Sequence, residues 1–444
     1  MANRQTVVVG LGATGLACLR HLATRGVPLL AMDTRTHPPG LDAARAAAPE
    51  VHFHLGSLDT ATLRAAERVI VSPGVALATP ELAEVAAAGV EVMGDIELFA
   101  REATAPVVAI TGSNGKSTVT AMVAALFRAA GVEVAVGGNF GTPAPELLDG
   151  PVPEAYVLEL SSFQLEATHT LKPKVAALLN VSADHLDRYP DLEAYAAAKA
   201  RIARGAGTLV VNRDDPRTAA MPAAGATVVG FTAGAPAPGD WGLVRDAQGE
   251  LQLAHGREAV MAASELPLVG RHNQMNALAA LAIGSAMGLP ERAMVEGLRR
   301  FEPLPHRCCR VAQREGIDWV DDSKGTNVGA TLAAVAGIEG PVVLIVGGEG
   351  KGQDFSPLWQ LASEGGLRGV VAIGRDGPAI AGPMADHIPV VEAADMEDAV
   401  AAAASLARRG DTVLLSPACA SFDMFRDYHE RGERFAAAVT GEQP

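Results

Sequence analysis

The fold is decided by residues 107–118, which read VVAITGSNGKST. The apolar run at 107–110 predicts a buried strand, and the Ala-rich stretch after the glycines predicts a helix from about Lys116 to Ala130. A glycine-rich turn between the two points several backbone N–H groups, and the start of the helix, at one anion. Lys116 can reach outer phosphates, and Ser117 can bind Mg²⁺. Position 110 is Ile, so the spacing departs from the full G-x-x-x-x-G-K-[ST] signature, but the stretch still predicts a triphosphate-binding loop.

Around this loop, short β-branched runs alternate with Ala- and Leu-rich stretches along nearly the whole chain, which is typical of βαβ units and parallel sheets. A chain of 444 residues is long enough for about three domains of roughly 150 residues each. The pattern restarts near residue 95, and two prolines interrupt it near residue 303. We therefore predict an α/β protein whose three domains each hold a mainly parallel sheet: a Rossmann-like domain at 1–94, a central P-loop domain at 95–303 and a Rossmann-like domain at 304–444. Within the central domain, residues 225–268 predict a small antiparallel annex with mobile turns.

The overall charge excludes some classes of function. Lys and Arg number 36 against 51 Asp and Glu, which gives −15, and so acidic a surface repels a phosphate backbone. We expect no nucleic-acid partner. No apolar stretch reaches about 18 residues, so we expect no membrane span. The four cysteines form no C-x-x-C pair and are few for the length, which suits the reducing cytoplasm.

A second glycine turn lies near the N-terminus. Residues 10–15 read GLGATG after the apolar strand Thr6–Val9, and Asp33 follows about 20 residues on. This is the spacing of the dinucleotide fingerprint, so an NAD-dependent dehydrogenase is one interpretation. The turn could equally hold another pyrophosphate, such as that of a nucleotide-sugar.

Several polar groups follow predicted strands of the central region. Glu159 lies at the end of the strand at 156–160, and Asp184 and His185 come shortly after the strand at 176–180. The carboxyl ends of parallel strands face the binding crevice, and carboxylates there suit Mg²⁺. Lys199 lies in a predicted helix, where its position alone is typical of a solvated lysine.

The last third of the chain holds a mixed cluster of cations, hydroxyls and carboxylates. Residues 322–327 read DSKGTN after a predicted strand, shortly after Arg307, and the strings at 347–352 and 416–421 also follow strands. Lys with Ser or Thr grips a carboxylate, and Asp suits an amine or Arg307. The cluster therefore predicts an anionic substrate.

Taken together, these residues resemble the Mur ligase family over the whole length. The turn at 111–118 is similar to the family's shortened phosphate loop, and Asn139, Glu159, Asp184, His185, Lys199, Asn273, Arg307 and the strings at 322–327 and 416–422 follow in family order. The string at 322–327 most favours the member that adds D-glutamate. Two positions depart from the family pattern: Glu349 stands where an Asp is expected, and Tyr428 where a Phe is expected.

The resemblance implies a role for each site residue. It implies catalysis by Lys116, His185 and Lys199. It implies ATP binding by Gly112, Ser113, Asn114, Gly115, Lys116, Ser117, Thr118, Asn273, Arg307 and Asp322. It implies binding of the uridine diphosphate sugar by Ala13, Thr14, Asp33, Thr34, Arg35, Ser72, Pro73, Gly74, Asn139 and Ser161. It implies binding of D-glutamate by Lys324, Thr326, Lys351, Ser421 and Phe422. It implies metal ligation by Ser117, Glu159, His185 and Lys199, with two Mg²⁺ ions and Lys199 as a carbamate.

The implied reaction is ATP-driven amide formation, in which UDP-N-acetylmuramoyl-L-alanine becomes an acyl phosphate and D-glutamate displaces the phosphate. Its implied setting is peptidoglycan synthesis, and through the cell wall, cell shape and division. We expect a monomer whose domains close around the substrates, with the hinge near Pro305. Besides the dehydrogenase, a folylpolyglutamate synthase and a non-enzymatic P-loop switch protein remain as alternatives.

Overall fold

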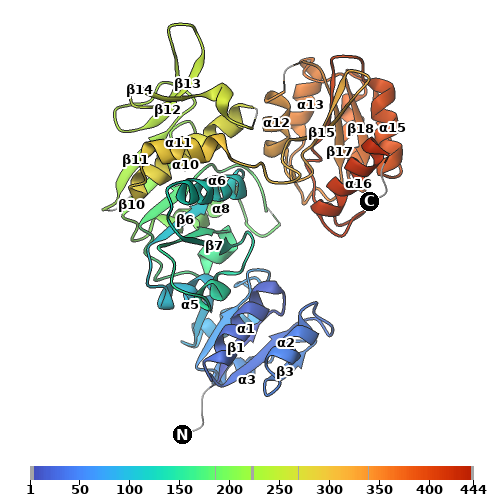
Figure 1. The fold of residues 1–444 in the computed structure, drawn as a ribbon. Helices are drawn as coiled ribbons and strands as arrows, with labels where there is room; N and C mark the ends of the chain where they lie inside the picture. The colour runs from blue at the N-terminus through green and yellow to red at the C-terminus, as the bar shows by residue number, and fades with distance from the viewer. Residues whose placement is uncertain (1–4, 186, 222–224, 269, 339, 442–444) are drawn as a thin grey trace.

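The computed structural model describes residues 5–185, 187–221, 225–268, 270–338 and 340–441. Three sheets follow one another along the chain, and each lies in its own part of the molecule (Figure 1). Most strand pairs in each sheet are parallel, with helices between the strands, so the predicted α/β class with three mainly parallel sheets is confirmed. In the described part of the chain, no helix is both long and apolar enough to cross a membrane.

The first sheet has the order β3-β2-β1-β4-β5 and is wholly parallel. Its central strand β1 is fully buried. Val7, Val8 and Val9 place apolar side chains on both faces of the sheet, as is typical of a parallel strand covered by helices on both sides. The elements are β1 (Thr6–Val9), α1 (Ala13–Thr24), β2 (Leu29–Asp33), α2 (Leu41–Ala47), β3 (His52–Leu55), α3 (Thr60–Ala65), β4 (Arg68–Val71), α4 (Pro80–Ala87) and β5 (Glu91–Gly94).

The second sheet has nine strands in the order β14-β13-β12-β11-β10-β9-β6-β8-β7. Helices α6 and α10 pack over it, and the all-apolar run from Ala277 to Ile283 of α10 is buried in the largest core cluster. Its elements run from α5 (Asp95–Glu102), β6 (Val107–Thr111), α6 (Lys116–Ala129), β7 (Val134–Gly138), β8 (Ala155–Glu159), α7 (Ser162–Glu166), β9 (Val175–Leu178), α8 (Leu192–Ala200), β10 (Thr208–Asn212) and α9 (Pro216–Ala219) to β11 (Thr227–Phe231), β12 (Trp241–Arg245), β13 (Leu251–His255), β14 (Glu258–Ala262), α10 (Arg271–Met287) and α11 (Glu291–Arg299).

The third sheet has the order β15-β16-β20-β17-β18-β19, and only its first pair is antiparallel. Strands β16, β20 and β17 are neighbours, so the loops after them meet at one edge. The elements are β15 (Cys309–Arg314), β16 (Ile317–Asp321), α12 (Val328–Ala336), β17 (Val342–Gly347), α13 (Ser356–Ser363), β18 (Gly369–Ile373), α14 (Gly377–Ala381), β19 (Val390–Glu392), α15 (Met396–Leu406), β20 (Thr412–Leu415) and α16 (Tyr428–Thr440).

The predicted antiparallel annex is only partly right. Strands β12, β13 and β14 do pair antiparallel, but β11 pairs parallel with β10 and joins the main sheet. The annex therefore extends the central sheet instead of standing apart from it (Figure 1).

Charged side chains join helix α1 to the central part of the chain. The fully buried ring of His21 lies 3.1 Å from Glu102 Oε1 and 3.3 Å from Asp149 Oδ1. Arg25 reaches the same two carboxylates at 3.0 and 3.4 Å, and Arg20 lies 3.6 Å from Glu146. This interface is therefore polar and ionic around a single buried imidazole.

The glycine turn at the start of α1 gives a stability prediction. Gly15 lies against the turn's own backbone, and a Cβ there would stand 1.7 Å from the carbonyl oxygen of Gly10. We expect Gly15→Ala to lower the free energy of unfolding by about 3 kcal/mol, because the backbone must shift to remove the clash. Gly12→Ala is the matched control: no atom lies within 4 Å of its Cβ, and we expect a loss of at most about 1 kcal/mol. Urea titrations of both variants measure this, and equal losses would contradict the prediction.

Candidate active site

The phosphate loop joins β6 to α6 at the carboxyl edge of the central sheet. Gly115 has a left-handed φ of +81° and is followed directly by the helix, which begins at Lys116. A Cβ on Gly115 would lie 2.5 Å from Oδ1 of Asn276 on α10. Glycine is thus required here both for the turn and for the close approach of α10.

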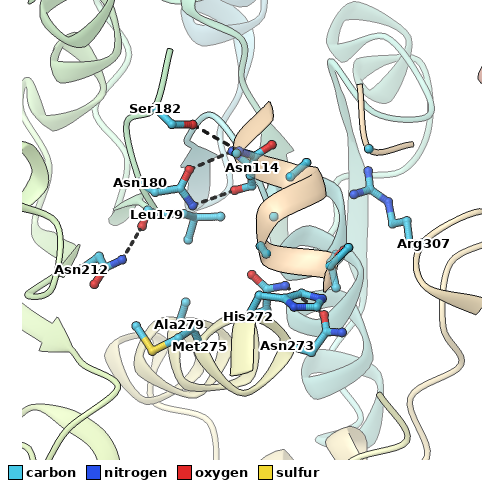
Figure 2. Close-up of a pocket in the computed structure, with 18 of the residues that line it drawn as sticks. Asn114, Leu179, Asn180, Ser182, Asn212, His272, Asn273, Met275, Ala279 and Arg307 are labelled. Carbon is cyan, nitrogen blue, oxygen red and sulfur yellow. Dashed lines mark hydrogen bonds between the residues drawn. The ribbon is translucent and has the colours of Figure 1, made fainter. Parts of the chain in front are cut away.

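Asn180 holds this loop from the turn that follows the neighbouring strand β9. Its Oδ1 accepts from the backbone N of Asn114 at 2.8 Å, and its Nδ2 donates to the backbone oxygen of Asn114 at 3.0 Å (Figure 2). One side-chain amide therefore satisfies both backbone groups of Asn114, as a paired strand would. The predicted strand at 176–180 ends at Leu178, which leaves Asn180 in the turn and its side chain available for this role.

A second set of bonds holds Ser113. Its Oγ donates to the backbone oxygen of Ser182 at 2.9 Å and accepts from the backbone N of Ser182 at the same distance. It also lies 3.3 Å from the hydroxyl of Tyr195 on α8. These bonds hold the loop from both sides and restrict its conformations, which lowers the entropic cost of binding an anion.

Two lysine ammonium groups meet at the carbonyl oxygen of Gly112. Lys116 Nζ donates to it at 2.9 Å and to the oxygen of Ser113 at 2.9 Å, and Lys199 Nζ donates to it at 2.8 Å. Lys199 is 1% exposed, so the interpretation of a solvated helix lysine is wrong. Burial lowers the pKa of Lys116 and lowers that of Lys199 much further, and the Lys116 charge adds to the second shift. The loop therefore holds concentrated positive charge that an anion would relieve.

Glu159 lies at the end of β8, buried beside this loop. Its Oε1 accepts from Nδ2 of Asn139 at 2.6 Å, while Oε2 is buried without a hydrogen-bond partner among the described residues. An orphaned carboxylate oxygen at a phosphate loop fits a divalent cation. Among the described residues, no group of three or more His, Cys, Asp and Glu side chains is placed to hold a metal ion.

His185 lies at the edge of an aromatic cluster. Its ring centroid is 4.9 Å from that of Phe163 and 6.3 Å from that of Tyr195. Asp184 Oδ1 accepts from the backbone N of His185, and burial lowers the pKa of the imidazole. A neutral imidazole at neutral pH is the form that binds a metal.

A cavity of about 370 Å³ opens between the phosphate loop, helix α10 and the third sheet's domain. This volume lies within the range of small-molecule sites. Six of the predicted ATP residues line it, with Arg307 facing the loop from the other side (Figure 2). They are Asn114, Gly115, Thr118, Asn273, Arg307 and Asp322. The other four, Gly112, Ser113, Lys116 and Ser117, adjoin the cavity within the same loop and first helical turn.

Two strings of the third domain are fastened together behind the cavity. Arg431 on α16 is fully buried and donates to both oxygens of Ser323, at 3.0 and 2.8 Å, and to the carbonyl of Cys419 at 3.1 Å. Asp322 links the same two strings, because its carboxylate accepts a hydrogen bond from Ser416 Oγ at 2.7 Å. Burial raises the pKa of Asp322 to about 7. The strings at 322–327 and 416–422 therefore form one unit.

The five residues predicted for D-glutamate come from the adjacent ends of β16, β17 and β20. Lys324 Nζ lies 3.9 Å from the ring centroid of Tyr428, and burial with the nearby Arg307 charge lowers its pKa to about 8. The structure gathers Lys324, Thr326, Lys351 and Ser421 at one edge, whereas Phe422 is 67% exposed.

The predicted sugar-nucleotide residues do not form one group. Eight of them lie at the end of β2 or after β1, β2 and β4, at the carboxyl edge of the first sheet, in a different domain from the phosphate loop (Figure 1). These are Ala13, Thr14, Asp33, Thr34, Arg35, Ser72, Pro73 and Gly74. The helix α1 begins there without a side-chain cap, which leaves backbone N–H groups for an anion.

The remaining two sugar-nucleotide residues lie in the central domain, where Asn139 bonds Glu159 and Ser161 caps α7 in a capping box with Gln164. In the first domain, Asp33 is already engaged. Its oxygens accept from the backbone N of Leu11 at 2.7 Å and from the Arg35 guanidinium at 2.8 and 2.9 Å. Although burial opposes it, these bonds lower the pKa of Asp33 to about 2. Asp33 therefore shapes the glycine turn directly.

Sequence reasoning assigned no role to three asparagines that the structure brings to the phosphate loop. They are Asn180, Asn276 and Asn327. Asn276 could have been found, because it stands three residues after Asn273 and so shares one helix face with it.

Known proteins resemble this chain over its whole length. Three family models match: "Mur ligase MurD-like, N-terminal domain" at 4–94, "Mur ligase middle domain" at 110–284 and "Mur ligase, glutamate ligase domain" at 306–419. The UDP-N-acetylmuramoylalanine–D-glutamate ligase of Nitrosococcus oceani is 51% identical over 98% of this chain and 96% of its own. That of Pseudomonas aeruginosa is 49% identical, over 98% and 97%.

Solved structures share the fold. The UDP-N-acetylmuramate–alanine ligase of Thermotoga maritima matches with a TM-score of 0.60 at 20% identity, over 98% of this chain and 99% of its own. A pseudomurein peptide ligase from Methanothermus fervidus gives 0.62 at 18% identity, over 99% and 100%. With close relatives matching along nearly the entire sequence, and with three family models placed one after another, this chain belongs to the Mur ligase family.

Proposed function

We propose that the protein is an ATP-dependent ligase that joins D-glutamate to UDP-N-acetylmuramoyl-L-alanine in peptidoglycan precursor synthesis. The relatives at about half identity carry that name, and the matched C-terminal model is a glutamate ligase domain. The observation that carries the proposal is the pair of lysines at Gly112, the half-buried Lys116 and the fully buried Lys199, beside a cavity shared with the third domain. This geometry serves a reaction that brings several anions together.

The work is divided among three units, for which we propose the bounds 1–94, 95–303 and 304–444. The first holds the uridine diphosphate end at the uncapped start of α1. The second holds ATP, and the third holds D-glutamate. We also propose that the protein acts as a monomer in the cytoplasm and meets neither nucleic acid nor membrane, since its charge of −15 repels polyanions.

The first chemical step transfers a phosphoryl group. A carboxylate oxygen of the muramoyl-alanine attacks the γ-phosphorus of ATP, the bond to the bridging oxygen breaks, and ADP leaves with that oxygen. Lys116 and the N–H groups of the loop stabilise the charge that develops on the phosphoryl oxygens. Arg307 and Asp322 line the nucleotide cavity from the third domain.

Glu159, Ser117, His185 and Lys199 are the proposed ligands of Mg²⁺. A bound cation there would neutralise phosphate charge and orient the transferring group. The orphaned Oε2 of Glu159 supports this assignment, and Asn139 fixes the other oxygen.

Lys199 is proposed to act as a carbamate. Its amine is buried and its pKa is lowered, which favours the neutral form that is nucleophilic toward carbon dioxide. Addition of the amine nitrogen to the carbon with loss of one proton gives an anionic group beside the Lys116 cation. The repulsion between two ammonium groups then becomes an attraction.

The second step forms the amide. The amine of D-glutamate attacks the acyl carbon, a tetrahedral intermediate forms, and phosphate leaves with the electrons of the broken carbon–oxygen bond while the nitrogen loses a proton. Lys324 and Thr326 would bind a carboxylate of D-glutamate, helped by Lys351, Ser421 and Phe422 from the neighbouring loops. The Phe422 side chain is exposed, so binding of D-glutamate against it would cover part of its ring.

The direct test measures phosphate release with UDP-N-acetylmuramoyl-L-alanine, ATP and Mg²⁺, with one amino acid supplied at a time. We expect release with D-glutamate to exceed that with L-glutamate or other amino acids by at least about 100-fold, because unpaired buried polar groups penalise a wrong fit. Replacing the muramoyl nucleotide by a folate is the control for the alternative ligase. Release that is independent of the amino acid would contradict the function.

The pH dependence of amino-acid binding tests Lys324. Its pKa is lowered to about 8 by burial, so below that pH its ammonium is present and binds a carboxylate, and above it the charge is lost. We expect the KM for D-glutamate to rise by about tenfold per pH unit well above pH 8. Lys324→Arg stays charged and should lose this dependence, while the KM for ATP serves as the control. The same alkaline rise in both proteins would contradict the role.

Labelled bicarbonate tests the modification of Lys199. After incubation with ¹³C-bicarbonate, we expect one slowly exchanging carbamate resonance in the NMR spectrum of the whole protein. Lys199→Met should remove it, because burial lowers the pKa of the Lys199 amine well below its ordinary value, whereas Lys172→Met at an exposed position should keep it. Retention of the signal without Lys199 would move the modification elsewhere.

A further inference from the structure

Asn327 joins the third domain to the phosphate loop through side-chain hydrogen bonds. This residue begins helix α12 (Val328–Ala336), is 3% exposed and lies 213 positions away from its partner Asn114. Its Nδ2 donates to Asn114 Oδ1 at 2.9 Å, and its Oδ1 accepts from Asn114 Nδ2 at 3.3 Å. Two side-chain amides thus face each other across the domain boundary.

The Asn327 amide has no spare capacity. Its second N–H donates to Asp184 Oδ2 at 3.3 Å, and its oxygen also accepts from the backbone N of Ala330 at 2.8 Å as the cap of α12. Two donors and two acceptor positions are all in use. Asp lacks the donors, Gln is one methylene longer, and Ser keeps only the cap, so asparagine alone satisfies every partner.

Both sides of the contact are rigid. Asn114 is held through its backbone by Asn180 and through Nδ2 by Ser182 Oγ at 3.2 Å. On the other side, a Cβ on Gly329 would lie 3.3 Å from Ser182 Oγ and 3.5 Å from Asn114 Nδ2. The first turn of α12 therefore approaches the loop closely, and movement of one element must move the other.

The neighbours of Asn327 give this contact its chemical meaning. Thr326 precedes it in the proposed D-glutamate string, Asn114 lies within the phosphate loop, and Asp184 precedes the proposed metal ligand His185. We propose that Asn327 is a positioning residue that sets the register between the amino-acid pocket and the phosphoryl-transfer loop. The inference rests on the proposed function, and it assigns Asn327 no contact with a reacting atom.

The relative position of the two domains matters because the amine of D-glutamate, held in the third domain, must reach the acyl carbon that forms at the central domain. A displacement of about 1 Å costs about 100-fold in rate in such a reaction. Loss of the amide pair should therefore lower kcat about 100-fold. The KM for the muramoyl nucleotide should stay unchanged, since its uridine diphosphate end binds in the first domain.

The experiment compares Asn327→Ser with Asn327→Ala. Ser is a good N-cap, so Asn327→Ser keeps the start of α12 but cannot reach Asn114, whereas Asn327→Ala loses both. We expect Asn327→Ser to melt within a few degrees of the wild type and yet to be about as slow as Asn327→Ala. Asn327→Asp, also a good cap, is the second variant should the serine protein fold poorly. A serine variant with wild-type kcat would overturn the proposal and leave Asn327 as a helix cap alone.

A double-mutant cycle tests whether Asn327 acts through Asn114. In an Asn114→Ala background, Asn327→Ser should change kcat by less than about threefold, since the amide pair is already lost. The full 100-fold effect in that background would overturn the proposal, because Asn327 would then act by another route.

A readout that needs no activity separates this inference from the function. Small-angle X-ray scattering of the full chain should give a larger radius of gyration for Asn327→Ser than for the wild type, because a domain contact is lost. Should the wild type show no ligase activity, the proposed function fails while this comparison still tests the contact. An unchanged radius together with an unchanged kcat would reject the positioning role outright.

Discussion

The contact on which the candidate site depends is the meeting of two lysine side chains at the carbonyl oxygen of Gly112. Lys116 and Lys199 both donate to Gly112, and burial keeps water from solvating them fully. Like charges in a low-dielectric site repel strongly, so the arrangement is stable only with counter-charges such as Glu159 nearby. The loop is therefore prepared for anionic ligands, whose charge would raise the lowered pKa values of both lysines and favour their ammonium forms.

The rest of the structure keeps this charged loop in one shape. Asn180 satisfies the backbone of Asn114, and Ser113 bonds Ser182 on the loop after the next strand. Because parallel strands end at one edge, loops far apart in sequence converge there. For the same reason the strings at 322–327 and 416–422 lie together at one edge of the third sheet, where Arg431 donates hydrogen bonds to both. Rigid elements thus carry the polar groups on both sides of the cavity.

The sequence was informative where the signal is local. The loop at 111–118 was predicted because strand, glycines and helix start are consecutive, and the three sheets followed from the alternating pattern. Lys199 was misjudged from its helix position, because its burial comes from α8 packing against the distant phosphate loop. No local pattern indicates a role for Asn327, because its partner Asn114 lies 213 residues away. Pairing of β11 with β10 was missed for the same reason: the sheet's tertiary contacts, not the local turns, decide it.

The ionic contact between α1 and the central domain makes the orientation of the first domain sensitive to salt. Apart from the buried His21, its members, such as Arg25, Glu102 and Asp149, are partly open to solvent. Mobile ions damp such attractions over about 8 Å at physiological ionic strength. The orientation of the first domain should therefore loosen as the salt concentration rises, whereas the hydrogen-bonded pair of Asn114 and Asn327 between the other two domains carries no net charge and should respond little.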